Sequence, residues 1–366
     1  MLKGVKLPLF NLNPKESPKE LFGREKETDE LIRLIKARRW VALLGPRMVG
    51  KTSLIKVANT KLEKTGIRAI YVNLWGTKGT QGLLSALAHG VNNEKTVLQK
   101  IKGAAEKIEG ISIGPGGISI SISKKPMTTM WDLLATIGKQ NENCVIELDE
   151  VQELSVISGH LLKLLANIFN TYPNIIFVFT GSMFGLIKTL LEPTSTSPLY
   201  GRSPAKLTLQ PFSRETAKEF LKKGFQEYNV AVKENLIDEA VERLDGIPGW
   251  LTLYGNNIAV QKLFHQKALE ETISEGIKIV KDELEHFLEG RERTLYLASL
   301  KAAAISARWK EIKGAIKTAK GSTVNDATVQ NILESLKAAM LIDEKDNTYR
   351  VNDPMLRTLL LTSQIT

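Results

Sequence analysis

A strand, a glycine-rich loop and a helix follow one another between residues 40 and 64, and this segment constrains the fold more than any other. Residues 40–44 form a short apolar run that predicts a buried strand, and the sequence "GPRMVGKT" follows at residues 45–52. The loop matches the pattern G-x-x-x-x-G-K-[ST], in which backbone N–H groups and a helix N-terminus face a bound phosphate. We therefore expect a phosphate-binding loop at the carboxyl end of a strand in an α/β sheet.

Each residue type in this loop has a chemical reason. Glycine at positions 45 and 50 lets the backbone curl inward, Lys51 would meet the β- and γ-phosphates, and Thr52 would hold Mg²⁺. A helix is expected over residues 51–64. The plain structural alternative is a glycine turn followed by a solvated lysine. The residues expected to contact a nucleotide here are Gly45, Pro46, Arg47, Met48, Val49, Gly50, Lys51, Thr52 and Ser53.

A second apolar run ends in carboxylates, as a nucleoside triphosphatase requires. The sequence "CVIELDEVQ" at residues 144–152 predicts a strand with Asp149 at its carboxyl end. We expect Asp149 to hold Mg²⁺ through water and Glu150 to polarise an attacking water molecule. A strand that simply closes in a charged turn is the alternative. Glu147 alternates with Asp149 and is expected to point the same way, with no role assigned.

The order of predicted elements indicates three domains. Strands and helices alternate to about residue 210, which favours a parallel αβα core with right-handed crossovers, preceded by an N-terminal arm. Helices alone follow, including residues 249–264 and 270–290. Three further helices and a short hairpin then predict a winged helix. The expected boundaries are 1–210 for the core with its arm, 211–290 for a helical lid and 291–366 for the winged helix.

The segment "GISIGPGGISISIS" interrupts the core pattern. Isoleucine and serine alternate around Gly-Pro-Gly-Gly, which predicts a β-hairpin at residues 111–123. Its even polarity predicts a protrusion outside the core. It carries no basic residue before residue 124, so a protein contact is a better interpretation than DNA.

Composition excludes several classes of protein. Hydrophobic residues make up 43% of the 366 residues, as in an ordinary globular protein, and the apolar runs are too short to span a bilayer. Cys144 is the single cysteine, so no internal disulfide can form, and a cytoplasmic location is expected. The residues before Phe10 show no secretory signal. The four histidines show no metal or triad spacing. The net charge of +10 permits contact with nucleic acid without requiring it.

Taken together, these motifs make the chain similar to a known family. It resembles the archaeal ATPase family within the AAA+ and STAND class of P-loop proteins. The stretches that carry the resemblance run in order along almost the whole chain: "LFGREKETDEL", "GPRMVGKTSLI", "VIELDEVQ", "FTGSMFGLI", "PLYGR", "LDGIPGWL" and "YRVNDPMLR". The two phosphate-site motifs mark the superfamily, whereas the Phe-Gly-Arg-Glu opening and the Gly-x-Pro of the lid are more specific.

The resemblance implies an ATPase that uses ATP or ADP with Mg²⁺. It implies that Phe22, Gly23 and Arg24 border the adenine, and that Pro248 packs near the base and ties the lid to the nucleotide state. It also implies a hydroxyl that orients water or senses the γ-phosphate, at Thr180 or Ser182.

Further along the chain, the resemblance implies that Arg202 senses the γ-phosphate, in its own chain or in a neighbouring subunit of a homo-oligomer. The lid lacks the arginine that many AAA+ enzymes carry there. That departure favours a switch over a fast motor.

Two functions remain open at this level. In one, the winged helix is a protein-docking or autoinhibitory module that nucleotide exchange controls. In the other, it binds DNA, as in related origin-binding initiators, through residues 301–320. The basic residues of that segment are Lys301, Arg308, Lys310, Lys313, Lys317 and Lys320. The helix expected in the major groove offers only Lys337 as a cation, and the wing is acidic, so specific duplex recognition is disfavoured. A small-molecule kinase is a third alternative, which the lid and winged helix disfavour.

Overall fold

The computed structural model describes residues 7–122, 124–181 and 186–362. The elements of the N-terminal half are α1 (Glu25–Lys36), β1 (Val41–Leu44), α2 (Lys51–Glu63), β2 (Arg68–Asn73), α3 (Gly79–Asn93), α4 (Lys95–Ala105), β3 (Ile111–Gly114), β4 (Gly117–Ile120), α5 (Pro126–Gly138), β5 (Cys144–Asp149), the 3₁₀ helix η1 (Val151–Ile157), α6 (Ser158–Thr171), β6 (Ile175–Gly181), α7 (Leu186–Leu191) and β7 (Ala205–Thr208).

A five-stranded sheet organises this half, in the order β2-β5-β6-β1-β7 with every neighbouring pair parallel. Every residue of β1, β5 and β6 is buried, because helices cover both faces of the sheet, and this explains their nearly continuous apolar sequences. The register places Leu44 opposite Gly181 and Asn73 opposite Asp149. The ends of these strands therefore meet at one edge, where the candidate site lies. The predicted parallel αβα core is confirmed.

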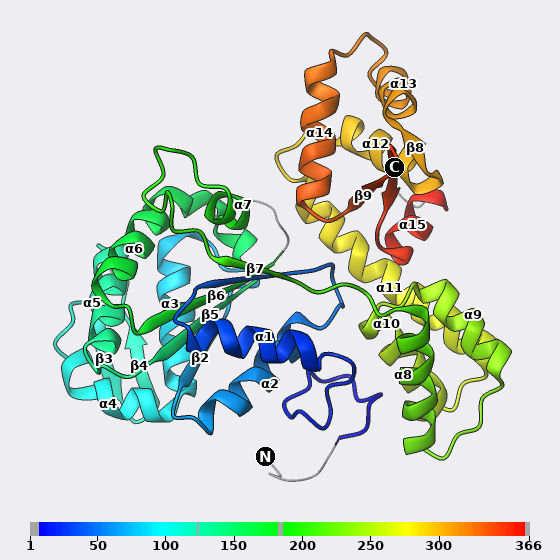
Figure 1. Ribbon diagram of the computed structural model, residues 1–366. Coiled ribbons are helices and arrows are strands. Elements are labelled where there is room, and N and C mark those ends of the chain that lie inside the picture. The colour runs from blue at the N-terminus through cyan, green and yellow to red at the C-terminus, as the bar shows by residue number, and fades with distance from the viewer. Residues whose placement is uncertain (1–6, 123, 182–185, 363–366) are drawn as a thin grey trace.

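The second half is helical and then forms a winged helix (Figure 1). Its elements are α8 (Arg214–Glu227), α9 (Glu234–Leu244), α10 (Pro248–Ala259), α11 (His265–Leu288), α12 (Arg293–Ile305), β8 (Ala307–Arg308), α13 (Trp309–Lys320), α14 (Asp326–Ala338), β9 (Ile342–Lys345), β10 (Thr348–Val351) and α15 (Pro354–Leu361). Strands β8, β10 and β9 form a small antiparallel sheet beside helices α12 to α14, which confirms the predicted winged helix. The boundaries expected at residues 210 and 290 fall between elements.

Two apolar cores divide the molecule. One surrounds the parallel sheet, and the other runs without a break from the lid through α11 into the winged helix. Phe10 of the arm is fully buried in the second core, and Met340 of the winged helix packs against the first. The N-terminal arm thus packs into the core of the helical half through Phe10, and the winged helix packs against the core of the parallel sheet through Met340. Among the described helices, none is both long enough and apolar enough to cross a membrane.

Two predictions of local structure were wrong. The hairpin formed by β3 and β4 is not a protrusion: Ile111 and Ile118 are buried in the sheet core, and the serines of the other face are exposed. The alternation of isoleucine and serine predicted the hairpin correctly. Its isoleucine face, however, packs against α3. The helix predicted over residues 249–264 ends at Ala259, because Lys262 adopts a left-handed conformation with φ of +60°, and the next helix starts at His265.

Candidate nucleotide site

The phosphate-binding loop joins β1 to α2 and has the conformation that its glycines predict. Gly50 precedes the first residue of α2 with φ of +100°. A Cβ at Gly45 would lie 2.9 Å from the carbonyl oxygen of Leu209, so only glycine fits where the loop passes the end of β7. The amino end of α2 is thus presented to the cavity, with its unpaired N–H groups and positive dipole.

Lys51 folds back over this loop. Its Nζ donates hydrogen bonds to the carbonyl oxygens of Gly45 at 2.8 Å and Pro46 at 3.1 Å. Burial lowers the pKa of the Lys51 ammonium, and the nearby carboxylates of Glu150 and Asp149 partly oppose that shift. A cation held by neutral carbonyl groups in a buried setting is well suited to bind phosphate oxygens, because a phosphate would replace weak partners with strong ones.

Asp149 lies at the carboxyl end of β5 and is 4% exposed. Its Oδ2 accepts hydrogen bonds from Thr52 Oγ1 at 3.0 Å and from Tyr71 Oη at 2.6 Å, and its Oδ1 accepts one from Thr180 Oγ1. Burial and the Asp149 charge raise the pKa of the Tyr71 phenol, so it stays a donor. The neighbouring carboxylate and hydroxyl oxygens are the hard ligands that Mg²⁺ prefers. Thr52 and Asp149 therefore fit the predicted magnesium site.

Thr180 holds the Asp149 carboxylate and the Glu150 backbone in place. Besides its bond to Asp149, its Oγ1 accepts a hydrogen bond from the backbone N–H of Glu150 at 3.3 Å, and the residue is fully buried. The strand that carries it lies between β1 and β5, as its place in the sheet requires. Its hydroxyl is thus directed at the Asp149 carboxylate in this structure. Ser182, the other candidate for the water-orienting hydroxyl, lies outside the described residues.

Glu150 turns its side chain into the cavity from a left-handed backbone conformation with φ of +62°. It lines both cavities that meet at the phosphate-binding loop. Left-handed conformations are costly for residues other than glycine and concentrate at functional sites. The carboxylate therefore lies in the cavities beside the phosphate-binding loop, and its role as the base stays a prediction.

Glu147 faces the same helix as Asp149, as its place in the strand predicted. It is fully buried, and its Oε2 accepts a hydrogen bond from Asn59 of α2 at 2.8 Å. Burial raises the pKa of its carboxyl to about 8. The residue joins β5 to the helix that follows the phosphate-binding loop.

A cavity of about 450 Å³ lies on the outer side of the phosphate-binding loop. Core, arm and lid all contribute to its wall, including Phe22, Arg24, Thr52, Pro248 and Thr252. Its size and apolar lining suit a nucleoside. Gly23 is not among the residues that line it.

Arg24 has a structural task in this wall. Its guanidinium is buried, donates to the carbonyl oxygens of Gln210 at 2.6 Å and Val49 at 3.4 Å, pairs with Glu27 at 2.9 Å and lies 4.7 Å from the centre of the Phe212 ring. Burial lowers its pKa. Arg24 therefore ties the phosphate-binding loop to the chain that leads into the lid, beside the predicted adenine site.

The N-terminal arm closes the outer side of this cavity, which sequence reasoning missed. Phe10 lies against Gly224 of α8 and Gly255 of α10, where a Cβ would come within 2.2 and 2.4 Å of its ring. Further along, the backbone N–H of Lys15 donates to Ser53 Oγ at 3.1 Å. The arm therefore joins the lid to α2 across the cavity. The sequence signal was the short apolar run "LPLFNL" at residues 7–12, within an arm rich in proline, lysine and asparagine.

The lid contacts the phosphate-binding loop directly. The backbone N–H of Gly249 donates to the carbonyl oxygen of Met48 at 2.9 Å, and a Cβ at Gly249 would lie 2.7 Å from the Met48 side chain. Pro248 begins α10 and lines the cavity. The Gly-x-Pro motif thus places a helix start against the loop.

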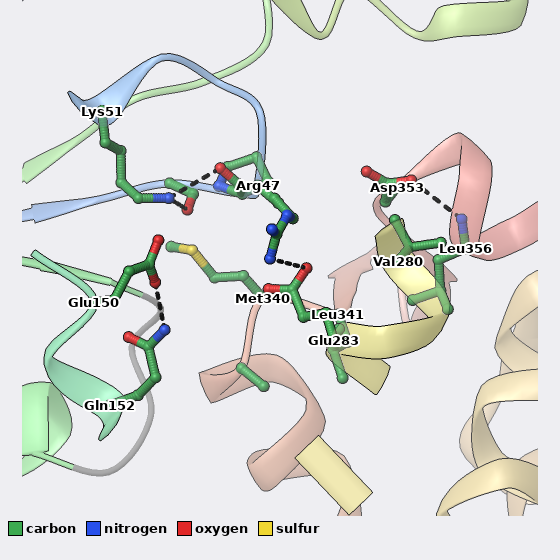
Figure 2. Close-up of a pocket in the computed structure, with 13 residues that line it drawn as sticks. Arg47, Lys51, Glu150, Gln152, Val280, Glu283, Met340, Leu341, Asp353 and Leu356 are labelled. Carbon is green, nitrogen blue, oxygen red and sulfur yellow. Dashed lines mark hydrogen bonds and ion pairs between the residues drawn. The ribbon is translucent and has the colours of Figure 1, made fainter. Parts of the chain in front are cut away.

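A second, small cavity of about 50 Å³ lies on the other side of the same loop (Figure 2). Arg47 pairs with Glu283 of α11 at 3.4 Å, and its guanidinium lies 5.3 Å from the centre of the Trp75 ring. Burial raises the pKa of the Glu283 carboxyl, and Arg47 and Lys51 oppose that shift. Met340, in the turn between α14 and β9, points from the winged helix toward Glu150 (Figure 2). The winged helix therefore covers the side where Glu150 would act.

A further contact joins α11 to the segment after β5. His286 Nε2 lies 3.3 Å from Glu153 Oε1 in η1, one helical turn beyond Glu283. Helix α11 thus contacts the phosphate-binding loop and the segment that directly follows the second motif, and it continues toward the winged helix. Sequence reasoning missed Glu283 and His286, since nothing local distinguishes them from solvated helix residues.

Arg202 lies near the start of β1, whereas the phosphate-binding loop follows the end of that strand. It precedes β7, whose first residue pairs with Val41 at the start of β1. Its guanidinium lies 5.6 Å from the centre of the Phe169 ring. Strand β1 separates the two places, and action of Arg202 within its own chain stays a prediction. Action on a neighbouring subunit likewise stays a prediction.

Comparisons with known proteins agree with this geometry. A sequence model for an ATPase domain predominantly from Archaea matches residues 21–253, and one for the C-terminal winged helix-turn-helix domain of MCM proteins matches residues 290–352. The chain is similar to the Walker-type ATPase PABY2304 of Pyrococcus abyssi, with 30% identity over 96% of this chain and 99% of that chain and a TM-score of 0.76. A comparison with curated proteins gives no match.

Two more distant structures share the fold. The ORC2 protein of Aeropyrum pernix, solved as ADPNP–ADP complexes, has 15% identity over 97% of this chain and 96% of that chain, with a TM-score of 0.62. The ORC1 protein of the same organism, solved in complex with DNA, has 16% identity over 96% and 95%, with a TM-score of 0.50.

Proposed function

The chain belongs to the family of ATPase domains found predominantly in Archaea, and from this premise we propose that it is a switch whose nucleotide state controls the contact between the winged helix and the phosphate-binding loop. The chain is an ATPase with an ORC-like fold and a C-terminal winged helix. The proposal concerns what hydrolysis does. It is the STAND-type interpretation of the sequence, with ATP or ADP and Mg²⁺ as the ligands.

The proposed chemistry assigns one step to each part of the site. Lys51 and the amino end of α2 bind the phosphates, and Thr52 and Asp149 hold Mg²⁺, which would neutralise phosphate charge. Glu150 accepts a proton from a water molecule whose oxygen bonds to the γ-phosphorus. The bond from that phosphorus to the β–γ bridging oxygen breaks, and ADP and phosphate leave.

One observation supports the switch above all others: Arg47 of the phosphate-binding loop is paired with Glu283 of α11 at 3.4 Å. Helix α11 is part of the continuous apolar core that includes the winged helix. A γ-phosphate near the loop would offer Arg47 a stronger, doubly charged partner than one carboxylate. Binding of ATP would then weaken the Arg47–Glu283 pair and loosen the contact of α11 and the winged helix with the phosphate-binding loop.

Met340 supports the same conclusion from the other end. It belongs to the winged helix, yet it packs against the core of the sheet and lines the small cavity with Glu150. Its side chain occupies the approach to the base in this structure. A change in the position of α11 would withdraw Met340, so hydrolysis and winged-helix release would be coupled.

A distance measurement tests the switch. The buried native cysteine is replaced (Cys144→Ala), and dyes are placed at Lys163→Cys on α6 and Lys317→Cys on α13, both exposed positions. Energy transfer is measured without nucleotide, with ADP and with a non-hydrolysable ATP analogue. We expect the ATP analogue to lower the transfer efficiency relative to ADP. Equal transfer efficiency in all three states would contradict the switch, provided that binding of ADP and of the analogue is confirmed in the same samples.

A matched pair of variants assigns the effect to the ion pair. Glu283→Gln removes the charge that faces Arg47, whereas Glu285→Gln makes the same change next to it on α11, where the partner is Arg293. We expect Glu283→Gln to bring the ADP state toward the low transfer efficiency of the ATP state. Glu285→Gln should behave like the parent protein.

DNA binding is the second candidate function, favoured by the exposed Lys310, Lys317 and Lys320 on α13. Against it, Lys337 of α14 is paired with Glu344 of the wing at 2.7 Å, and Lys313 is paired with Asp326. The test is steady-state hydrolysis with and without duplex DNA at low and moderate salt. Strong stimulation that fades with salt would make DNA the working partner. A rate indifferent to DNA would favour the protein-facing switch.

A further inference from the structure

The carboxylate of Glu150 has a dedicated partner two residues along the chain. The Nε2 of Gln152 donates a hydrogen bond to Oε2 of Glu150 (Figure 2). Resting on the proposed role of Glu150, we propose that Gln152 is a positioning residue for hydrolysis: it holds the Glu150 carboxylate in the direction from which it receives the proton of the attacking water. Among the described residues, Gln152 forms a hydrogen bond with Glu150 and none with the phosphate-binding loop.

The backbone around Glu150 is fixed, but its side chain depends on Gln152. The Glu150 N–H donates to Thr180 Oγ1, and its carbonyl oxygen accepts from Glu153 N–H at 3.1 Å. Within the described part of the chain, Gln152 provides the hydrogen bond that the Glu150 carboxylate receives. A glutamate side chain has three rotatable bonds, so a fixed backbone alone leaves its carboxylate free to swing. One directed bond removes much of that freedom.

The residues around Gln152 restrict the position of its side-chain amide. A Cβ at Gly181, the last residue of β6, would lie 2.3 Å from Gln152 Oε1, so only glycine leaves room for the amide. Oε1 is buried and has no hydrogen-bond partner among the described residues. An unpaired buried oxygen is costly, and the reverse orientation of the amide would place that oxygen against the Glu150 carboxylate. The seat therefore favours the orientation in which Nε2 faces Glu150.

The experiment compares Gln152→Met with the parent in steady-state hydrolysis at saturating ATP and Mg²⁺. Methionine keeps the length and removes the donor. We expect kcat to fall by about tenfold, as loss of one transition-state interaction would cause, while the Kd for ADP stays within about twofold. Gln140→Met is the matched control, since the Gln140 side chain donates to Thr136 at the end of α5. It should leave both quantities unchanged.

A double-mutant cycle separates positioning from a general structural role. If Gln152 acts through Glu150, Gln152→Met should cost little more once Glu150→Gln is present, because the two changes remove one function. Additive losses, an unchanged kcat in Gln152→Met, or an increased kcat would each overturn the proposal. Should Gln152→Met fold poorly, Gly181→Ala displaces the amide without changing either side chain and should slow hydrolysis in the same direction.

The cycle also distinguishes this proposal from the one on which it rests. If Glu150→Gln hydrolyses ATP at the parent rate, Glu150 is not the base and the proposed function loses its chemical step. If Glu150→Gln is slow while Gln152→Met is normal, only the positioning role fails.

Discussion

The two cavities that meet at the phosphate-binding loop differ in size and in what encloses them. The outer one, of about 450 Å³, is enclosed by the core, the arm and the lid. The inner one, of about 50 Å³, is enclosed by the same loop, α11 and the winged helix. Arg47, Lys51 and Glu150 line both. The outer cavity is shaped to accept a nucleoside, whereas the inner one is nearly filled by the chain itself.

The difference between the cavities indicates that nucleoside binding belongs to the outer cavity and the proposed regulation to the inner one. At the outer cavity, the lid contacts the loop through the Gly249 backbone, and the arm contacts α2 through Lys15. Binding of a nucleoside is therefore expected to act on the lid and the arm. The inner cavity involves Glu283 and Met340, which belong to the body that the nucleotide is proposed to control. Because Arg47, Lys51 and Glu150 line both cavities, a change on one side of the loop is expected to affect the other side through these residues.

The largest effect is expected from Lys51→Ala, because Lys51 lines both cavities. Loss of the buried cation removes the main charge that meets the phosphates, and we expect the affinity for ADP and ATP to fall by at least about 100-fold. The measurement is a titration with a fluorescent nucleotide. Retained binding would show that the amino end of α2 holds the phosphates without Lys51. The importance assigned to Lys51 from its position between the two cavities would then be wrong.

Glu150→Gln should affect hydrolysis without affecting nucleotide binding, although Glu150 lines both cavities. The substitution keeps the shape and removes the base, so we expect kcat to fall by at least about tenfold while the Kd for ADP stays unchanged. Rates come from phosphate release and affinities from the same fluorescent titration. Equal turnover would remove Glu150 from the mechanism.

Thr252→Trp should affect the outer side alone. Thr252 faces the large cavity from α10, and an indole there would take space that the nucleoside needs. We expect the Kd for ADP to rise by about fivefold to tenfold, with the single-turnover rate at saturation nearly unchanged. A fall in rate with normal affinity would mean that the two sides are not separable.

The smallest effect concerns the arm. Burial lowers the pKa of Lys15 from 10.5 to about 8, although Glu20 and Glu227 oppose it. Between these two pH values the unfolded chain binds more protons at this site, so the free energy of unfolding should rise with pH there, and stay level below pH 8. Denaturant unfolding of the parent and of Lys15→Gln, compared at several pH values, measures it. Parallel curves would show that the arm is not closed over the cavity in solution.

Much of the candidate site could be predicted from sequence because its residues act locally. The turn that Gly45 and Gly50 allow depends on a few neighbouring dihedral angles, and its register with α2 follows from them. Asp149 could be placed because parallel strands end at a common edge. The apolar face of the hairpin was visible in its alternation, but nothing local showed that α3 would cover it.

The sequence by itself thus determined the phosphate-binding loop, the strand that ends in Asp149, the alternating core and the winged helix. Only the tertiary structure decided that Phe10 seats against two glycines more than 200 residues away, that Glu283 faces Arg47, and that Met340 reaches the core. The physical reason is range. Backbone conformation and strand order follow from local sterics and apolar periodicity, whereas pairing between distant side chains depends on how whole elements pack.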